Sequence, residues 1–241
     1  MLFKDFLEYW YKNCCLTKLS PTTYESYRRN LDNYIIKCLG SYKLSDLKPL
    51  HLQSFYTECQ NAGLANKTIV YFHRIIHSSL HQAQKWQFIY NNIADCVEIP
   101  KVDKYIPNVL DSTQISKLYQ CAKKTNLYIP IMIAISTGMW RGEVLGLTWD
   151  NVDLEKGTIS VLQTLYPTQN GLIILPPKTK SSIKTITITK TLIDILHEHR
   201  IKQNKIKKIL DIQYINNNLV CCKSNGEALN PSTFNHNFKD F

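Results

Sequence analysis

Apolar side chains recur at the three- and four-residue spacing of amphipathic helices over the first third of the chain. Four stretches carry this pattern, and their apolar positions are Phe3, Phe6, Leu7, Trp10 and Tyr11; Tyr24, Tyr27, Leu31, Tyr34 and Ile35; Leu52, Phe55, Tyr56 and Cys59; and Ile69, Phe72, Ile76, Leu80 and Ala83. Since each stretch presents one apolar face, the pattern predicts four helices around a shared core. The short loops between them predict a compact helical bundle.

Residues that begin or end helices mark the boundaries of these stretches. Ser20-Pro21 places an N-cap serine before a proline at the first helical position of the second helix. Gly40 follows the end of that helix, Pro49 begins the third, and Ala62-Gly63 ends it. Asn66 is predicted to cap the fourth helix.

A different pattern begins after the fourth helix. Residues 97–112 contain two prolines and mixed charge but no sustained helical period, which is typical of a linker. The sequence therefore predicts a helical domain over residues 1–96, a linker over 97–112 and a second domain over 113–241.

The second domain is predicted to run from helices to a sheet and back to helices. We expect helices from Asp111 or Ser112 to Cys121, from Leu127 to Thr137 with Gly138 as its end, and briefly before Trp149; strands Thr158–Tyr166, Leu172–Pro176 and Ile183–Thr189; a helix opened by Thr191; an extended piece Leu219–Cys222; and a last helix from Pro231. Asn170-Gly171 predicts a hairpin turn between the first two strands. The predicted fold class is mainly α with a small antiparallel sheet.

The charge balance indicates a polyanionic partner. Lys and Arg number 29 against 19 Asp and Glu, a formal net charge of +10, and nucleic acid is the commonest partner of such a protein. Candidate phosphate contacts lie on the predicted helices and at their N-termini, where hydroxyls and free N–H groups can meet phosphates: Thr22, Thr23, Arg28, Arg29, Lys67, Thr68, Arg74, His77 and Lys85. The alternative is a solvated basic face on an otherwise ordinary protein.

The eight cysteines indicate reduced thiols rather than a metal site. No pair has C-x-x-C spacing, and most cysteines fall in apolar stretches. We expect an intracellular, cytoplasmic protein, because the N-terminal stretch is too polar for a signal peptide and no apolar run has the length of a membrane span.

The stretch TGMWRGEVLGLTWDNVDLEKGTISV (residues 137–161) resembles the first catalytic box of the tyrosine recombinases, the phage and conjugative-transposon integrases. That box has the approximate form T-G-[LM]-R-x-[GS]-E-[LV]-L-x-L-x-W-x-D-[IV]-D. LSPTTYESYRRNLDNYI and NKTIVYFHRIIHSSLHQAQKWQFIYNNIAD resemble the helical (SAM-like) core-binding domain of these integrases, PPKTKSSIKTITI their strand turn, and LVCCKSNGEALNPSTFNHNF the segment before their second box.

The resemblance implies DNA strand exchange without a metal ion or other cofactor. In the family a tyrosine attacks the scissile phosphate and forms a 3′-phosphotyrosine link, two arginines hold the non-bridging oxygens, a lysine protonates the leaving oxygen and a histidine assists. This is covalent catalysis combined with a preorganised cationic clamp. Arginine suits the clamp because its planar fork binds phosphate and stays charged.

The family's roles transfer only in part to this chain. Lys180 matches the catalytic lysine, with an exposed turn lysine as the alternative, and Lys178 in the same turn is a candidate DNA contact. Glu143 matches the acidic residue that supports the box. Trp140 occupies the position of the first arginine, and Arg141 is a weak substitute because adjacent helical residues point about 100° apart.

The resemblance also predicts that the chain is truncated before the second box, H-x-x-R, and the nucleophilic tyrosine. His197-Glu198-His199-Arg200 fits H-x-x-R only as a pattern, because it follows the third strand directly, and Tyr214 lies in a loop. Phe234, Phe238 and Phe241 of the last helix have no following partner helix.

Three interpretations of function follow. The chain is an integrase that binds double-stranded DNA but has lost cleavage, a non-enzymatic DNA-binding fragment that competes with a full-length recombinase, or a product that does not fold. Family members assemble as tetramers by exchanging a C-terminal segment, so we do not expect a stable tetramer here.

Overall fold

The computed structural model of the chain describes residues 1–177 and 182–239, and the chain divides into two compact units. The N-terminal unit comprises Met1–Pro107, and the C-terminal unit begins at Asn108. Among the described residues, no helix combines the length and apolar character needed to cross a membrane.

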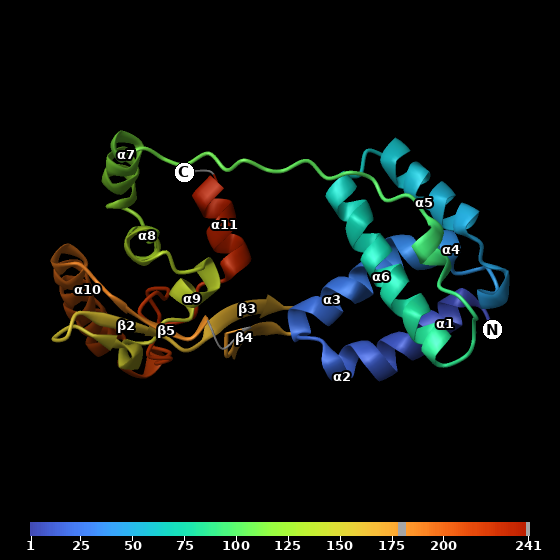
Figure 1. The fold of residues 1–241 in the computed structure, drawn as a ribbon. Helices are drawn as coiled ribbons and strands as arrows, with labels where there is room; N and C mark the ends of the chain where they lie inside the picture. Colours follow the sequence, from blue (N-terminus) through green and yellow to red (C-terminus); the bar gives the residue numbers. More distant parts are fainter. Residues whose placement is uncertain (178–181, 240–241) are drawn as a thin grey trace. The chain divides into compact units, whose positions relative to one another are not determined.

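The N-terminal unit contains the four predicted helical stretches (Figure 1). Its helices are α1 (Phe3–Trp10), α2 (Leu16–Lys18), α3 (Pro21–Asn30), α4 (Ile36–Leu39), α5 (Pro49–Asn61) and α6 (Asn66–Lys85). The π-helical turn η1 (Tyr11–Cys15) joins α1 to α2, and a second, η2 (Leu31–Ile35), joins α3 to α4. Each of the first two predicted helices is therefore one continuous stretch with a π-helical insertion.

The predicted apolar faces meet in the core of the N-terminal unit. Phe3, Phe6, Leu31, Leu52 and Ile69 are at most 1% exposed. Aromatic rings fill the space between the helices. Phe72 of α6 lies 5.9 Å from Phe55 of α5 and 4.9 Å from Tyr34, measured between ring centroids. Burial of such rings is the main stabilising contribution in a unit of this size.

Two predicted helix caps differ in detail. Ser20 occupies the N-cap position of α3, but its hydroxyl bonds the Thr23 hydroxyl at 2.9 Å instead of a backbone N–H. Asn66 is the first residue of α6 rather than its cap, and its amide donates a hydrogen bond to the Lys101 carbonyl oxygen. That bond ties the segment after α6 to the helix.

The C-terminal unit has the predicted order of helices and strands. Its elements are α7 (Ser112–Ala122), α8 (Tyr128–Thr137), α9 (Arg141–Leu145), β1 (Val152–Asp153), β2 (Thr158–Val161), β3 (Thr164–Thr168), β4 (Gly171–Leu175), β5 (Lys184–Thr187), α10 (Lys190–Leu210) and α11 (Pro231–Lys239), with short 3-10 turns η5 (Trp149–Asn151) and η7 (Asp211–Gln213). Asp111 caps α7 in a reciprocal capping box with Gln114. The cap of α10 is Thr189, two residues before the predicted start.

The single predicted strand Thr158–Tyr166 is wrong, because the chain breaks it at residues 162–163. β2 pairs antiparallel with β1 and β5, whereas β3 pairs antiparallel with β4 in a separate two-stranded sheet. The Gln163 amide donates to the Gly146 carbonyl oxygen at 2.7 Å, which turns the chain out of the first sheet. The hairpin at Asn170-Gly171 is confirmed, with Thr168 opposite Gly171. The predicted fold class is also confirmed, with two small sheets in place of one.

A buried histidine makes the stability of the N-terminal unit depend on pH. His73 is 8% exposed, and its Nδ1 lies 3.0 Å from the Tyr56 hydroxyl. Burial is the largest cause that lowers the pKa of His73, and the neighbouring His77 lowers it further. The unfolded chain therefore binds more protons than the folded one between the two pKa values.

We expect the free energy of unfolding to be greatest above pH of about 6.5, the ordinary value for histidine, and to fall as the pH drops below it. Urea unfolding across this pH range measures the effect. His73→Gln, which keeps a polar partner for Tyr56, should weaken the pH dependence. His81→Gln on the exposed side of the same helix is the matched control. An unchanged pH dependence in His73→Gln would assign the effect to another group.

Candidate active site and DNA contacts

The residues of the predicted catalytic box lie where α8 ends and α9 begins. Gly138 ends α8 in the left-handed conformation, with φ of 66°. Trp140 is the N-cap of α9, and its backbone N–H donates to Oε2 of Glu143 at 2.8 Å. Glu143 is 5% exposed. The predicted supporting role of Glu143 thus has a geometric basis, since its carboxylate holds the turn that carries Trp140 and Arg141.

Two glycines let α9 lie directly against β3. A Cβ at Gly142 would come within 2.6 Å of Thr164 Cγ2 and 2.9 Å of the Leu165 carbonyl oxygen. A Cβ at Gly146, one turn later, would come within 2.9 Å of the Leu165 backbone nitrogen. Distances under 3.0 Å are essentially never seen for a real Cβ. The approach of helix and strand therefore depends on the absence of side chains at these positions.

An open cavity of about 610 Å³ lies at this junction. It is lined by Trp140, Arg141, Gly142 and Glu143 of the box, by Thr164, Leu165, Tyr166 and Pro167 of β3, and by Pro177, Ser182 and Asn235. Trp140 is 77% exposed and Thr164 is 7% exposed. Sequence reasoning placed Trp140, Arg141 and Glu143 together but missed Tyr166 and Asn235, because no motif marks them and only the strand pairing and α11 bring them here.

Several polar groups around this cavity have no hydrogen-bond or ion-pair partner in the part of the chain that the structure describes. Within residues 1–177 and 182–239, the Arg141 guanidinium, the Tyr166 hydroxyl and the Asn235 carboxamide make no hydrogen bond or ion pair. The predicted site residues Lys178 and Lys180 lie outside the described residues. Pro177 and Ser182, on either side of that segment, both line the cavity.

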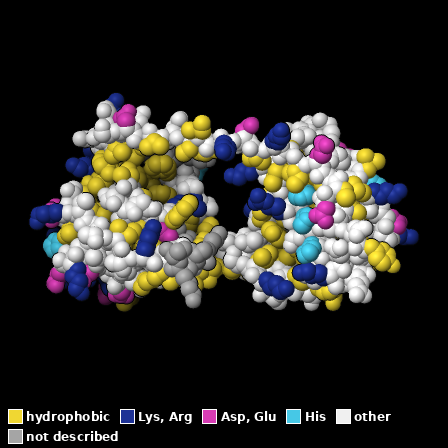
Figure 2. Space-filling view, in the orientation of Figure 1, with side chains coloured by type: hydrophobic (Ala, Val, Ile, Leu, Met, Phe, Trp, Pro, Cys, Tyr) yellow, Lys and Arg dark blue, Asp and Glu magenta, His cyan; other side chains and the backbone are white. Residues whose placement is uncertain are grey.

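An apolar groove adjoins the cavity on the other side of Arg141. It has a volume of about 290 Å³ and is lined mainly by Leu110, Leu118, Ile131, Ala134, Ile135, Phe234 and Phe238. Figure 2 shows hydrophobic side chains gathered in a hollow over this part of the C-terminal unit. Arg141 and Asn235 line both spaces, so they form the ridge between them.

The H-x-x-R pattern on α10 and Tyr214 differ in their surroundings. His197, the histidine of the pattern, is exposed, whereas the next histidine, His199, is half-buried. His199 Nε2 lies 2.7 Å from the Val220 carbonyl oxygen, and burial lowers the pKa of His199. The Arg200 guanidinium lies 5.2 Å from the centre of the Trp149 ring. Burial, with a hydrogen bond to Cys222, raises the pKa of Tyr214 to about 12, which disfavours the phenolate that a nucleophile requires.

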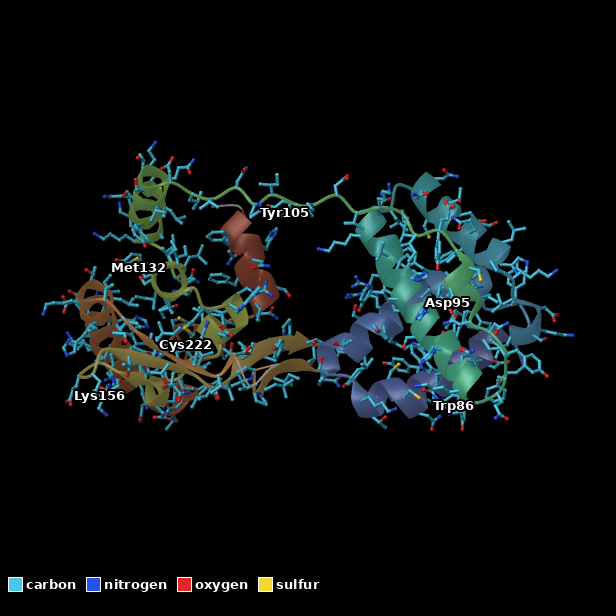
Figure 3. All side chains as sticks on the ribbon, viewed as in Figure 1. Trp86, Asp95, Tyr105, Met132, Lys156 and Cys222 are labelled. Carbon is cyan, nitrogen blue, oxygen red and sulfur yellow. The ribbon has the colours of Figure 1, made fainter. Side chains whose placement is uncertain are left out.

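Gln203 connects Trp149, Tyr214 and Cys222 in a half-buried network that the sequence did not reveal. Its side-chain oxygen accepts from Trp149 Nε1 at 2.7 Å, and its nitrogen donates to the Leu219 carbonyl oxygen at 2.9 Å. The same nitrogen lies 2.9 Å from Cys222 Sγ, and Cys222 is labelled in Figure 3. Gln203 therefore joins α10 to the extended segment around Cys222. Among the described residues, no cluster of three or more ligating side chains could hold a metal ion.

The predicted DNA contacts of the N-terminal unit differ in their availability. Arg29, Lys67 and Arg74 are exposed and make no hydrogen bond or ion pair with another described residue. His77 Nε2 lies 2.8 Å from Asp95 Oδ1. The Thr22 hydroxyl bonds weakly to that of Ser20 at 3.4 Å, and the half-buried Thr68 lies in the first turn of α6.

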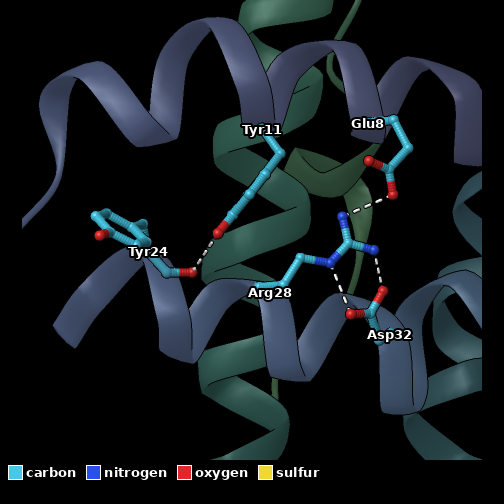
Figure 4. Close-up of polar contacts among 5 residues, drawn as sticks. All are labelled: Glu8, Tyr11, Tyr24, Arg28 and Asp32. Carbon is cyan, nitrogen blue, oxygen red and sulfur yellow. Dashed lines mark hydrogen bonds and ion pairs between the residues drawn. The ribbon is translucent and has the colours of Figure 1, made fainter. Parts of the chain in front are cut away.

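Arg28, a candidate phosphate contact, is held by ion pairs within the N-terminal unit. Figure 4 shows its guanidinium between α1 and α3, where Nη1 donates to Glu8 Oε1 at 2.6 Å and Nε donates to Asp32 Oδ2 at 2.6 Å. The guanidinium also lies 5.3 Å from the centre of the Tyr11 ring, and hydrogen bonding to Arg28 lowers the pKa of Asp32. Two carboxylates and a ring face hold Arg28, so its role in the structure is to join these helices.

We expect Gly142→Ala to destabilise the C-terminal unit by about 1–3 kcal/mol, because the new methyl group forces α9 away from β3. Urea unfolding measures the change. Thr164→Ser in the Gly142→Ala background removes the nearest atom, Thr164 Cγ2, and should recover part of the loss, with Thr164→Ser alone as the control. A Gly142→Ala protein as stable as the parent would show that α9 and β3 are not in close contact.

Comparison with known proteins places these features in a family. Residues 2–60 match the family model "Phage integrase, N-terminal SAM-like domain", and residues 108–241 match "Phage integrase family". A tyrosine recombinase XerC-like protein of Caldanaerobacter subterraneus is 27% identical over 233 residues, 88% of this chain and 58% of that protein. The ICEBs1 integrase of Bacillus subtilis is 20% identical over 85% of this chain and 56% of its own length.

Two solved structures share the fold. The Tn1549 transposon integrase in complex with circular intermediate DNA superposes with a TM-score of 0.80 at 18% identity, over 100% of this chain and 77% of that one. A lambda integrase dimer bound to a COC′ core site gives a TM-score of 0.70 at 17% identity, over 100% and 80%. The chain spans a little over half the length of the XerC-like and ICEBs1 relatives. Since the integrase model covers more than half of its residues, the chain belongs to the phage integrase family.

Proposed function

We propose that this chain binds double-stranded DNA at a recombination core site and is deficient in strand cleavage because of Trp140. The observation that carries the proposal is the exposed indole of Trp140 at the box position where the resemblance to tyrosine recombinases expects the first arginine. The scaffold around that position is intact, since Glu143 holds the turn and α9 lies against β3. Residue 140 therefore lacks the charge of an arginine, while the turn and the helix that support it are in place.

DNA binding is supported by relatives and by charge. The Tn1549 and lambda integrases with the same fold are described as bound to DNA. This chain has a formal net charge of +10, and Arg29, Lys67 and Arg74 present cations without partners among the described residues. Such side chains bind phosphates and give affinity without sequence preference.

Cleavage deficiency follows from what an indole can offer. Indole has one N–H donor and no charge, whereas a guanidinium has five donors and a permanent charge. Loss of one such group at a preorganised oxyanion site costs about 10²–10³ in rate. Arg141 is available, but it is the next residue along α9 and also lines the apolar groove, so it does not take the place of the missing guanidinium.

A second candidate function also depends on DNA binding and on cleavage deficiency. A chain that binds a core site without cleaving the DNA would compete with a full-length recombinase for that site. Trp140 favours this candidate, because it removes the clamp charge and leaves the cations of the N-terminal unit in place. We also propose that Lys180 is the lysine that matches the catalytic lysine of the family. We expect that the chain forms no stable tetramer and requires no cofactor.

We expect DNA affinity to fall steeply with salt, because each phosphate contact releases counterions. Trp140→Arg should add about one contact and steepen the slope of log K against log salt concentration by about 0.9. Ile212→Arg adds the same charge at a residue 94% exposed in the same unit and serves as the control. Fluorescence anisotropy with a labelled duplex measures both slopes. Affinity that does not change with salt would contradict DNA binding through phosphates.

Cleavage is tested separately with a nicked suicide substrate that traps the phosphotyrosine link. Within the time in which an intact recombinase reacts fully, we expect no covalent adduct of this chain in a denaturing gel, since loss of the first arginine slows cleavage by about 10²–10³. An intact tyrosine recombinase on its own nicked site is the positive control. A trapped adduct of the unaltered chain would contradict cleavage deficiency while leaving DNA binding in place.

A further inference from the structure

We propose that the cavity beside Trp140 binds a single unpaired nucleotide of DNA, with its base stacked on the indole. The inference rests on the proposed DNA binding and adds a ligand and a geometry to it. It concerns the cavity of about 610 Å³ between α9, β3 and α11, within the range of small-molecule sites. The lining residues named below all lie within residues 1–177 and 182–239.

The indole of Trp140 is set apart from the other tryptophans of the chain. Trp10 and Trp149 are 3% and 8% exposed, and Trp86 packs edge-on against Tyr9 at 5.5 Å between ring centroids. Trp140 is 77% exposed and makes no ring contact with another described residue. An exposed indole offers a large flat apolar surface, and a flat ring best covers a flat ring.

The polar groups around the ring match the other parts of a nucleotide. The Arg141 guanidinium fits a phosphate, and the Asn235 carboxamide can both donate to and accept from the edge of a base. The Tyr166 hydroxyl provides a further donor or acceptor. None of these three groups has a hydrogen-bond or ion-pair partner among the described residues. An aromatic side chain of a protein would cover the ring but would leave the guanidinium and the carboxamide without partners.

The ligand must be unpaired, because a base inside a duplex has both faces covered by its neighbours. Proteins reach such a base only by taking it out of the stack or by binding a single strand. Stacking on an aromatic side chain then tolerates any base, since every base has a π-face. We therefore expect a preference for DNA structure and no strong preference for sequence at this site.

The experiment compares two duplexes of equal length and sequence, one fully paired and one with a single bulged thymidine. We expect the bulged duplex to bind about 5- to 150-fold more tightly, the range that base stacking supplies, and to quench tryptophan emission. The quenching due to Trp140 is the loss of emission in the parent protein minus the loss in Trp140→Phe, because the other three tryptophans are common to both proteins.

Variants separate stacking from charge. Trp140→Ala should reduce the affinity ratio of bulged to paired DNA to about one, and Asn235→Ala should reduce it in part. Trp140→Arg should raise the affinity for both duplexes, since a cation binds phosphates in either. Its ratio of bulged to paired affinity should still fall to about one. Tyr105→Ala removes another highly exposed aromatic ring, 86% exposed and labelled in Figure 3, and should leave the ratio unchanged.

The outcomes distinguish this inference from the proposed function. Equal affinity of the parent for the two duplexes overturns the nucleotide site and leaves DNA binding standing. A Trp140→Ala protein that keeps the full ratio also overturns it, because the preference then comes from another surface. Failure of the parent to bind either duplex overturns both proposals.

Discussion

The contact between α9 and β3 is the constraint on which the C-terminal unit depends. Gly142 and Gly146 bring the helix backbone against Thr164 and Leu165, at distances that no side chain would permit. The chain must leave its first sheet to reach this position, and the bond from Gln163 to the Gly146 carbonyl oxygen holds it there. β3 pairs with β4 alone, and residues of β3 form one wall of the cavity. The site is thus a consequence of backbone packing rather than of any polar motif.

Much of the fold follows from the sequence because apolar periodicity and turn residues act locally. The buried positions Leu52, Phe55 and Tyr56 follow from helical spacing, and Gly138 ends α8 as predicted. The break in the strand after Val161 was not predicted, since residues 158–166 have uniform strand character and the break comes from a tertiary hydrogen bond. The π-helical turns at residues 11–15 and 31–35 likewise leave the apolar pattern almost unchanged.

In the candidate site too, the residues that are close in sequence could be predicted, and those that only tertiary folding brings together could not. Trp140, Arg141 and Glu143 are neighbours in one motif, so a resemblance in sequence was enough to bring them together. Tyr166 and Asn235 come from a strand and a helix far along the chain, and only folding places them in the cavity. Arg28 shows the opposite limit. It was a candidate phosphate contact, but Glu8 of α1 and Asp32 of η2 hold its guanidinium, and a helical pattern contains no information on the partner helix.

The resemblance places Trp140 at an arginine position, and the fold is compatible with either side chain because the support of residue 140 comes from its backbone. The Glu143 carboxylate accepts a hydrogen bond from the backbone N–H of Trp140. The Trp140 side chain is exposed to solvent and contacts no other described ring. A change of side chain there alters charge and ring surface while the turn, α9 and β3 keep their contacts. In the function that we propose, the isolation of the Trp140 side chain lets one substitution both remove a clamp cation and add a stacking surface. A guanidinium at this position attracts any phosphate within reach, whereas an indole gains only where a base is free to leave its stack.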